Sequence, residues 1–125
     1  MNRVHVVARI SSEPDGRHEE IVATYRHAAN AEARLRALDD EQNRRLRIKD
    51  ELDRALAELR IDSARVGQSY GRDACELHAT LLSHIEAAEV AWLEAAGIDQ
   101  RAERDAIRAL DPTLRHEIWI LTLAD

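Results

Sequence analysis

Cys75 and His78 come nearest to a catalytic arrangement in this sequence. The apolar spacing predicts a helix over 73–96, whose first turn holds Cys75, and a helix N-terminus lowers the pKa of a thiol. His78 lies three residues later on the same helix face, so a nucleophile and base pair is conceivable. However, Asp73 and Glu76 oppose thiolate formation, and no glycine-rich loop supplies an oxyanion hole. We therefore predict no catalytic residues, and an enzyme with an unrecognised Cys75 and His78 site is the second alternative.

The six histidines do not follow the spacing of a metal site. His78 and His84 are six residues apart, which places them about 240° apart around a helix, on different faces. His5, His18 and His116 lie in or beside predicted strands, without the close ligand pairs that zinc requires. We predict neither a metal site nor a cofactor.

Basic residues are densest around residues 44–49, where Arg44, Arg45 and Arg47 precede Lys49, the only lysine among 18 basic side chains. Acidic residues flank this stretch, and it contains no aromatic side chain that could stack on a base. The net charge of the chain is −6. Because nucleic-acid binding needs a basic surface, we expect no direct contact with nucleic acid.

Acidic side chains of the second half form the predicted contact surface for a partner protein. They are Glu76, Glu86, Glu89, Glu94, Glu103 and Asp105. On the helix over 73–96, an apolar stripe should face the core and leave the glutamates on the solvent side. The stripe consists of Leu77, Leu81, Ile85 and Trp92. Such a surface suits a partner with a basic groove. The alternative is pairing with basic residues of the first long helix, namely Arg34, Arg36 and Arg54.

Alternating apolar residues predict strands at both ends of the chain. The segment 3–25 should form a β-hairpin around the turn Pro14-Asp15-Gly16, with Ile21, Ala23 and Tyr25 on one face. The segment 117–123 is apolar on both faces, which is typical of a strand that is central or covered on both sides. Together these strands predict a small three-stranded sheet.

Helical spacing fills the middle of the chain. No Pro or Gly interrupts 27–66, and we favour one long helix there, although the polar run at 39–45 leaves a break open. A second long helix should span 73–96 and end at Gly97, and a short helix capped by Asp99 should span 99–110. The predicted fold is a single mostly helical α+β domain with an antiparallel helical hairpin. The apolar stripe over 31–59 could instead pair with a second copy, which is the homodimer alternative.

The class of the protein follows from absences and from its layout. With a single cysteine the chain has no intrachain disulfide, and no apolar run approaches the ~20 residues of a membrane span, so we expect a cytoplasmic protein without a membrane partner. The order of strands and helix over 4–10, 21–25 and 31–38 resembles short proteins encoded by phages and mobile elements. That resemblance implies binding to a host complex. We therefore expect a non-enzymatic interaction module, such as an inhibitor that acts by surface occlusion.

Overall fold

The computed structural model describes the backbone of residues 2–13, 16–69 and 72–124, and the side chains of these residues except 13, 63, 64, 66–69 and 72–78. Three strands and four helices form a small α+β protein, as predicted. The chain divides into two compact units. Unit 1 comprises Met1–Arg45 and Asp111–Asp125, and unit 2 comprises Leu46–Leu110.

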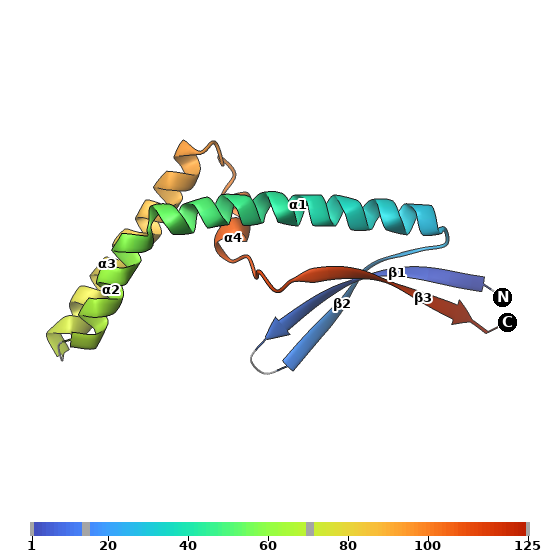
Figure 1. The fold of residues 1–125 in the computed structure, drawn as a ribbon, viewed down its shortest axis with the longest axis horizontal. Coiled ribbons are helices and arrows are strands. Elements are labelled where there is room, and N and C mark those ends of the chain that lie inside the picture. Colours follow the sequence, from blue (N-terminus) through green and yellow to red (C-terminus); the bar gives the residue numbers. More distant parts are fainter. Residues whose placement is uncertain (1, 14–15, 70–71, 125) are drawn as a thin grey trace. The chain divides into compact units, whose positions relative to one another are not determined.

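Unit 1 is built on an antiparallel sheet with the strand order β2-β1-β3 (Figure 1). The strands are β1 (Asn2–Glu13), β2 (Gly16–Tyr25) and β3 (Arg115–Leu123). The predicted hairpin is confirmed by the pairing of β1 with β2, which ends at Glu13 and Gly16. Gly16 has a φ of +139°, which residues with a side chain rarely adopt, while Pro14 and Asp15 lie outside the described residues.

A β-bulge in β2 changes which residues share a face. Ala23 pairs with Val7 and Ile21 pairs with Ala8, so Val22 is an extra residue between the two pairs. Because one extra residue moves the following side chains to the other face, Ile21 does not share a face with Ala23. The predicted common face of Ile21, Ala23 and Tyr25 was therefore wrong, and Ile21 is 61% exposed.

The strand buried on both faces is β1, not the C-terminal strand. Val7 is fully buried on one face of β1, and Ala8 and Ile10 are buried on the other. β3 pairs with β1 along its whole length and lies at a sheet edge beside the hairpin, which confirms the predicted three-stranded sheet, although two apolar faces are more typical of a central or doubly covered strand. Apolar residues on both faces of a strand therefore do not determine whether it pairs with one neighbouring strand or with two.

The part of helix α1 (Ala28–Ala55) that belongs to unit 1 lies along one face of the sheet (Figure 1). The Nδ1 atom of His116 on β3 is 3.4 Å from the Oδ1 atom of Asp39 on α1, and His116 pairs with Arg9 on β1. The side chains that share a face with His116 therefore point toward α1. We call the opposite face the outer face. It carries Val4, Val6, Ala8, Ile10, Ile21, Glu117, Trp119 and Leu121.

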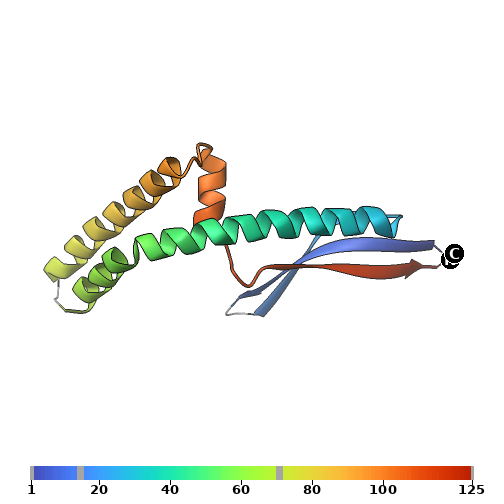
Figure 2. The same cartoon turned by 45° about the horizontal axis from the view of Figure 1, so that its top comes forward.

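Unit 2 contains an antiparallel helical hairpin, formed by α2 (Ala57–Ser69) and α3 (Arg72–Ala95) (Figure 2). The predicted first arm was a single helix over 27–66, but the arm that packs on α3 is α2 alone. Its buried core is Leu52, Leu93 and Ile107, with Leu56 packed against it. The polar run at 39–45 lies inside α1, and the helix is interrupted at Leu56 instead. Arg60 pairs with Asp53 at 2.6 Å across this interruption, which no Pro or Gly marks.

The C-terminal end of α3 confirms Gly97 as its stop signal. Gly97 has a φ of +89°, and its N–H donates to the carbonyl of Glu94 at 3.0 Å. The N–H of Ile98 donates to the carbonyl of Leu93 at 2.9 Å. These two bonds form a Schellman motif, in which an apolar contact between the first and last partner is common. Ile98 indeed packs against the core that contains Leu93.

The short helix α4 (Arg101–Arg108) begins two residues later than predicted. Its N-cap residue is Gln100, without a side-chain cap, so the predicted capping by Asp99 was wrong. The carbonyl of Asp99 instead accepts a hydrogen bond from Arg104 at 2.8 Å. At the other end, the Nζ atom of Lys49 donates to the carbonyls of Arg108 at 3.2 Å and Leu110 at 2.8 Å.

Replacing Lys49 with methionine is expected to lower the free energy of unfolding by about 1–3 kcal/mol, because two carbonyls at a helix end lose a charged donor. The apolar stem of the side chain is kept. The exposed Arg47, two residues away, provides the matched control, and Arg47→Met should change the value by less than about 0.5 kcal/mol. Chemical denaturation followed by circular dichroism measures both. Equal losses in the two variants would show that Lys49 has no special role.

Candidate interaction surface

The predicted reactive pair lies near the start of α3. Cys75 and His78 belong to α3, but their side chains lie outside the described residues. Among the side chains that the structure describes, no group of three or more His, Cys, Asp or Glu residues is arranged to hold a metal ion.

The predicted acidic contact residues of unit 2 are largely engaged in ion pairs. Glu86 pairs with Arg108 at 3.5 Å, and Glu94 pairs with Arg104 at 3.9 Å. Asp105 lies 3.8 Å from Arg101. Glu103 also has an interaction partner, and the side chain of Glu76 is outside the described residues. The structure thus gives a mixed-charge surface there, and binding of a basic partner to it stays a prediction.

Glu89 does not lie on the solvent side as expected. Its side chain is only 16% exposed, and its Oε2 atom lies 3.4 Å from Arg60 and 3.7 Å from Arg108. Glu89 is four residues after the buried Ile85 and four before the buried Leu93, so it shares their helix row. The predicted stripe omitted Leu93, and including it would have placed Glu89 at the core boundary. The pairing arginines also differ from the expected Arg34, Arg36 and Arg54.

The basic stretch around residue 44 contributes to internal contacts. Arg45 pairs with Glu41 at 2.7 Å one helical turn away, and Lys49 binds the end of α4. Arg44 has an interaction partner as well. These contacts indicate that Arg45 and Lys49 stabilise the fold around α1. Engaged in this way, the two side chains do not form an array of cations that could bind phosphate groups.

His116 is a buried polar residue that the sequence does not reveal. Its side chain is 3% exposed, and neither ring nitrogen has a hydrogen-bond partner, although Asp39 lies 3.4 Å away. Gln42, one turn after Asp39 on α1, donates to the carbonyl of Leu114. These contacts join α1 to the start of β3 and make His116 part of the interior of unit 1.

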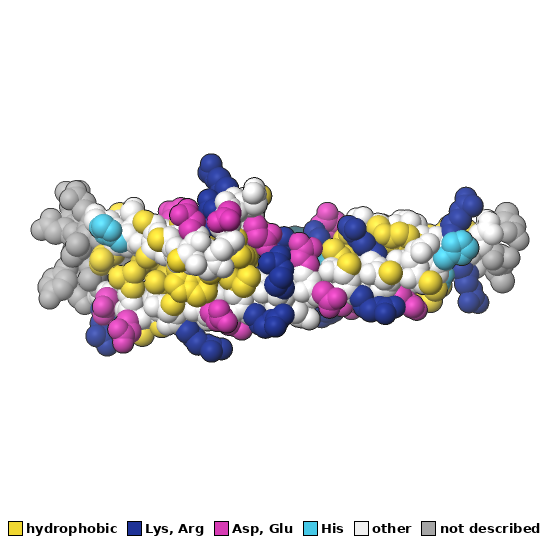
Figure 3. Space-filling view, turned by 90° about the horizontal axis from the view of Figure 1, so that it is seen from above, with side chains coloured by type: hydrophobic (Ala, Val, Ile, Leu, Met, Phe, Trp, Pro, Cys, Tyr) yellow, Lys and Arg dark blue, Asp and Glu magenta, His cyan; other side chains and the backbone are white. Residues whose placement is uncertain are grey.

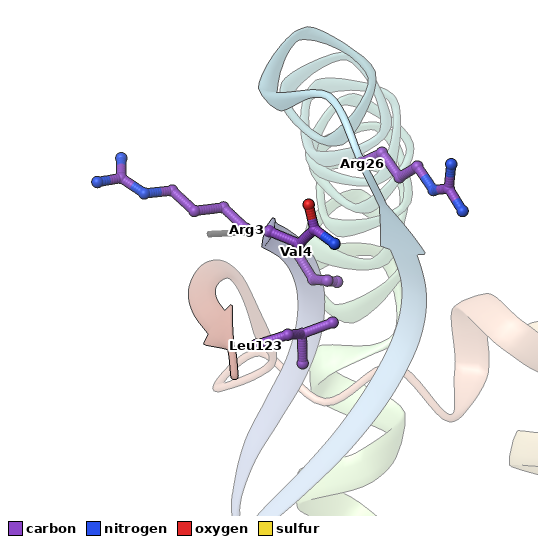
Figure 4. Close-up of a pocket in the computed structure, with 5 residues that line it drawn as sticks. Arg3, Val4, Arg26 and Leu123 are labelled. Atoms are coloured by element: carbon purple, nitrogen blue, oxygen red, sulfur yellow. The ribbon is translucent and has the colours of Figure 1, made fainter. Parts of the chain in front are cut away.

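A pocket of about 460 Å³ lies at the end of the sheet where β1 begins and β3 ends. It is lined by Asn2, Arg3, Val4, Arg26 and Leu123. Figure 4 shows that the guanidinium groups of Arg3 and Arg26 point away from one another. The two cations therefore do not converge on a common anion, and the pocket does not have the arrangement of an anion site.

The free edge of β3 is the most exposed apolar element of unit 1. Ile120 is 59% exposed, Leu121 49% and Leu123 50%. Apolar side chains on an unpaired strand edge favour pairing with another chain, because the backbone N–H and C=O groups of that edge also lack partners in the sheet. The uncharged run at 118–123 was visible in the sequence, but its position at an edge was not.

Three side chains on the outer face of β3 form a ladder. The indole N–H of Trp119 donates to Glu117 at 3.2 Å, and Nε of Arg115 donates to the other oxygen of Glu117 at 3.1 Å. The hydrogen bond from Trp119, supported by Arg115, holds the pKa of Glu117 below its ordinary value of 4.5. The charges of Arg115 and Glu117 at the start of β3 are thus paired with each other.

The ladder gives a pH-dependent signal. Because the folded pKa of Glu117 is lowered, its stabilising contribution is present above pH 4.5 and is lost as the pH falls through the folded pKa. In a Trp92→Phe background, we expect the fluorescence of Trp119 to change with a midpoint below 4.5. Glu117→Gln, which retains a hydrogen-bond acceptor, should abolish this change. A midpoint at or above 4.5, or an unchanged titration in Glu117→Gln, would contradict the assignment.

Unit 2 also exposes apolar surface. Figure 3 shows hydrophobic side chains gathered on one face of the part of the molecule that holds α2 and α3. The large apolar side chains exposed among those described in these helices are Ile61 at 52% and Leu82 at 49%.

Within the described residues, no helix is both long and apolar enough to cross a membrane. Comparison of the chain with protein families, with curated proteins and with solved structures finds no match.

Proposed function

We propose that the protein is a non-enzymatic protein-interaction module that binds through the free edge of β3. The observation that carries this proposal is the exposure of Ile120, Leu121 and Leu123 on an edge strand. An added strand would satisfy the unpaired backbone groups of β3 and bury these side chains at the same time. Main-chain hydrogen bonds supply affinity in this mode, and the alternating side chains supply specificity.

The helical homodimer alternative has less support. Its proposed interface is the apolar stripe over 31–59, but Ala31 and Leu52 in that stripe are fully buried. Leu35 and Leu38 are half-buried, and Leu56 packs against the core of unit 2. A stripe that the chain itself covers leaves little apolar surface for a second copy.

Inhibition of a host complex by surface occlusion is one form that such binding takes. It requires no catalytic constellation, because an added strand blocks the surface of its partner directly. A phage or mobile-element origin and a partner with a basic surface belong to this proposal. The carboxylates of Glu86, Glu94 and Asp105, with side chains 55–66% exposed, provide a second contact for a basic partner.

The test compares tagged full-length chains in the source cells. The double variant Leu121→Lys and Leu123→Lys places cations on the β3 edge, and Ile21→Lys places one on the exposed part of β2. We expect a protein to be recovered with the wild type and with Ile21→Lys, and its recovery to fall at least about tenfold with the double variant. Equal recovery with both variants, or no associated protein with the wild type, would overturn the proposal.

A further inference from the structure

The two edges of the sheet are protected differently. Along β2, the first half carries Arg17, Glu19 and Glu20, and all three take part in ion pairs. Charged residues on an edge strand discourage pairing with other chains. Along β3, the six residues 118–123 contain no charge, no Pro and no Gly. The uncharged part of β2, residues 21–25, contains the bulge at Val22, and a bulge also discourages edge pairing. The β3 edge is therefore better suited to an incoming strand than the β2 edge.

The charged start of β3 does not protect the rest of that strand. Arg115 and Glu117 are bound to each other at 3.1 Å, and Glu117 is also held by Trp119. Their charges are thus matched on the outer face before the apolar segment begins. The segment that follows presents Ile120 and Leu121 on opposite faces of the strand, each about half exposed.

β3 is complementary to itself when two copies meet antiparallel. A two-fold axis perpendicular to the sheet keeps each face continuous across the two copies. Residues that oppose one another must then lie on the same face, so their numbers differ by an even number. One residue therefore faces its own copy across the axis. An axis at Ile120 pairs only residues of β3. It opposes Ile120 to Ile120, Trp119 to Leu121, Ile118 to Thr122, and Glu117 to Leu123. No like charges face one another in this register, and like charges directly opposed would be destabilising.

We propose that two copies of this chain associate through β3, about a two-fold axis at Ile120, to form a continuous six-stranded sheet. The inference rests on the proposed function and names its partner as a second copy. Pairing would join the outer faces of the two sheets and bring Trp119 of each copy against Leu121 of the other. It would thereby cover apolar side chains that one copy leaves half exposed.

The residue on the axis provides the sharpest test, because it faces its own copy. Ile120→Lys and Ile120→Glu each place two like charges together, and each should raise the dimer Kd at least about tenfold. A mixture of the two variants opposes Lys to Glu and should restore association. The matched controls are Ile21→Lys and Ile21→Glu, since Ile21 is equally exposed and lies on the other edge strand. Sedimentation equilibrium of the full chain, with folding checked by circular dichroism, measures each Kd.

A second measurement tests the same register without placing a charge at residue 120. In a Cys75→Ser background, Ile120→Cys would place two thiols opposite each other, with Cβ atoms about 4.5–5.5 Å apart, close enough for an interchain disulfide after a small adjustment. Oxidation should cross-link this variant faster than Ile21→Cys. Equal rates would overturn the inference.

The outcomes separate the dimer from the general proposal. A wild type that is monomeric at all concentrations would refute pairing of two copies at this register. A dimer Kd that is unchanged by a charge at residue 120 would refute it as well. If a different recovered protein still depends on Leu121 and Leu123, the proposed function stands without the dimer. If no association depends on the β3 edge, both are refuted.

Discussion

Replacing Leu93 with alanine is expected to lower the free energy of unfolding of unit 2 by about 2–5 kcal/mol. Leu93 is fully buried in the small core that it forms with Leu52 and Ile107. The loss combines the transfer free energy of the removed atoms with the cavity that they leave. It should be large because, among the described side chains of unit 2, only Leu52, Ile85 and Ile107 are buried beside Leu93. Chemical denaturation followed by far-ultraviolet circular dichroism measures the change.

The control for Leu93 lies on the same helix. Leu82 is 49% exposed, so Leu82→Ala removes the same atoms from a site that is already half in water. We expect a loss of about 1 kcal/mol or less. If both variants were destabilised equally, the core assignment of unit 2 would be incorrect.

Replacing Ile10 with alanine should destabilise the sheet of unit 1 by about 2–5 kcal/mol. Ile10 is 1% exposed on the central strand, between Arg115 of β3 and Glu19 of β2. Both neighbours are charged residues that cannot fill an apolar cavity without losing water, so the site should collapse poorly. Amide hydrogen exchange of the strands measures the local change, because it reports protection residue by residue.

Ile21→Ala tests whether this effect comes from burial. Ile21 lies on the same outer face, but it is 61% exposed. Its removal should change strand protection by less than about 1 kcal/mol. A comparable loss in Ile21→Ala would mean that side chains of this face contribute through something other than their burial in unit 1.

Much of the fold follows from local sequence rules. β2 begins at Gly16 and α3 ends shortly before Gly97, and both glycines have a positive φ that their predicted roles require. The strand segments and the helical hairpin follow from apolar periods of two and about 3.6. These signals are local, so a single sequence contains them.

Other features depend on contacts between distant segments. The bulge at Val22 reverses the face of Ile21, and one extra residue leaves no mark in an alternating pattern. The interruption at Leu56 occurs where that side chain packs against the core, without a helix-breaking residue. Glu89 is drawn to the core boundary by Arg60 and Arg108, which come from two other helices. The sequence predicted none of these three features.

The candidate surface illustrates the same division. The acidic residues stand out in the sequence, but Glu86 and Glu94 find arginines that only the fold brings near. The apolar run at the end of β3 was equally visible in the sequence, and its apolar residues on both faces suggested burial. In the structure β1 is the central strand, so these apolar residues of β3 lie on an open edge of the sheet.

Amide hydrogen exchange of β3 at low and high protein concentration tests the central claim most directly. In an antiparallel edge strand, alternate backbone N–H groups point away from the neighbouring strand and lack a partner in the sheet. If the β3 edge pairs with a second copy, these amides within 117–123 should exchange more slowly as the concentration rises. The outward amides of β2 should not change and serve as the internal control. Exchange rates in β3 that are independent of concentration would contradict association through this edge.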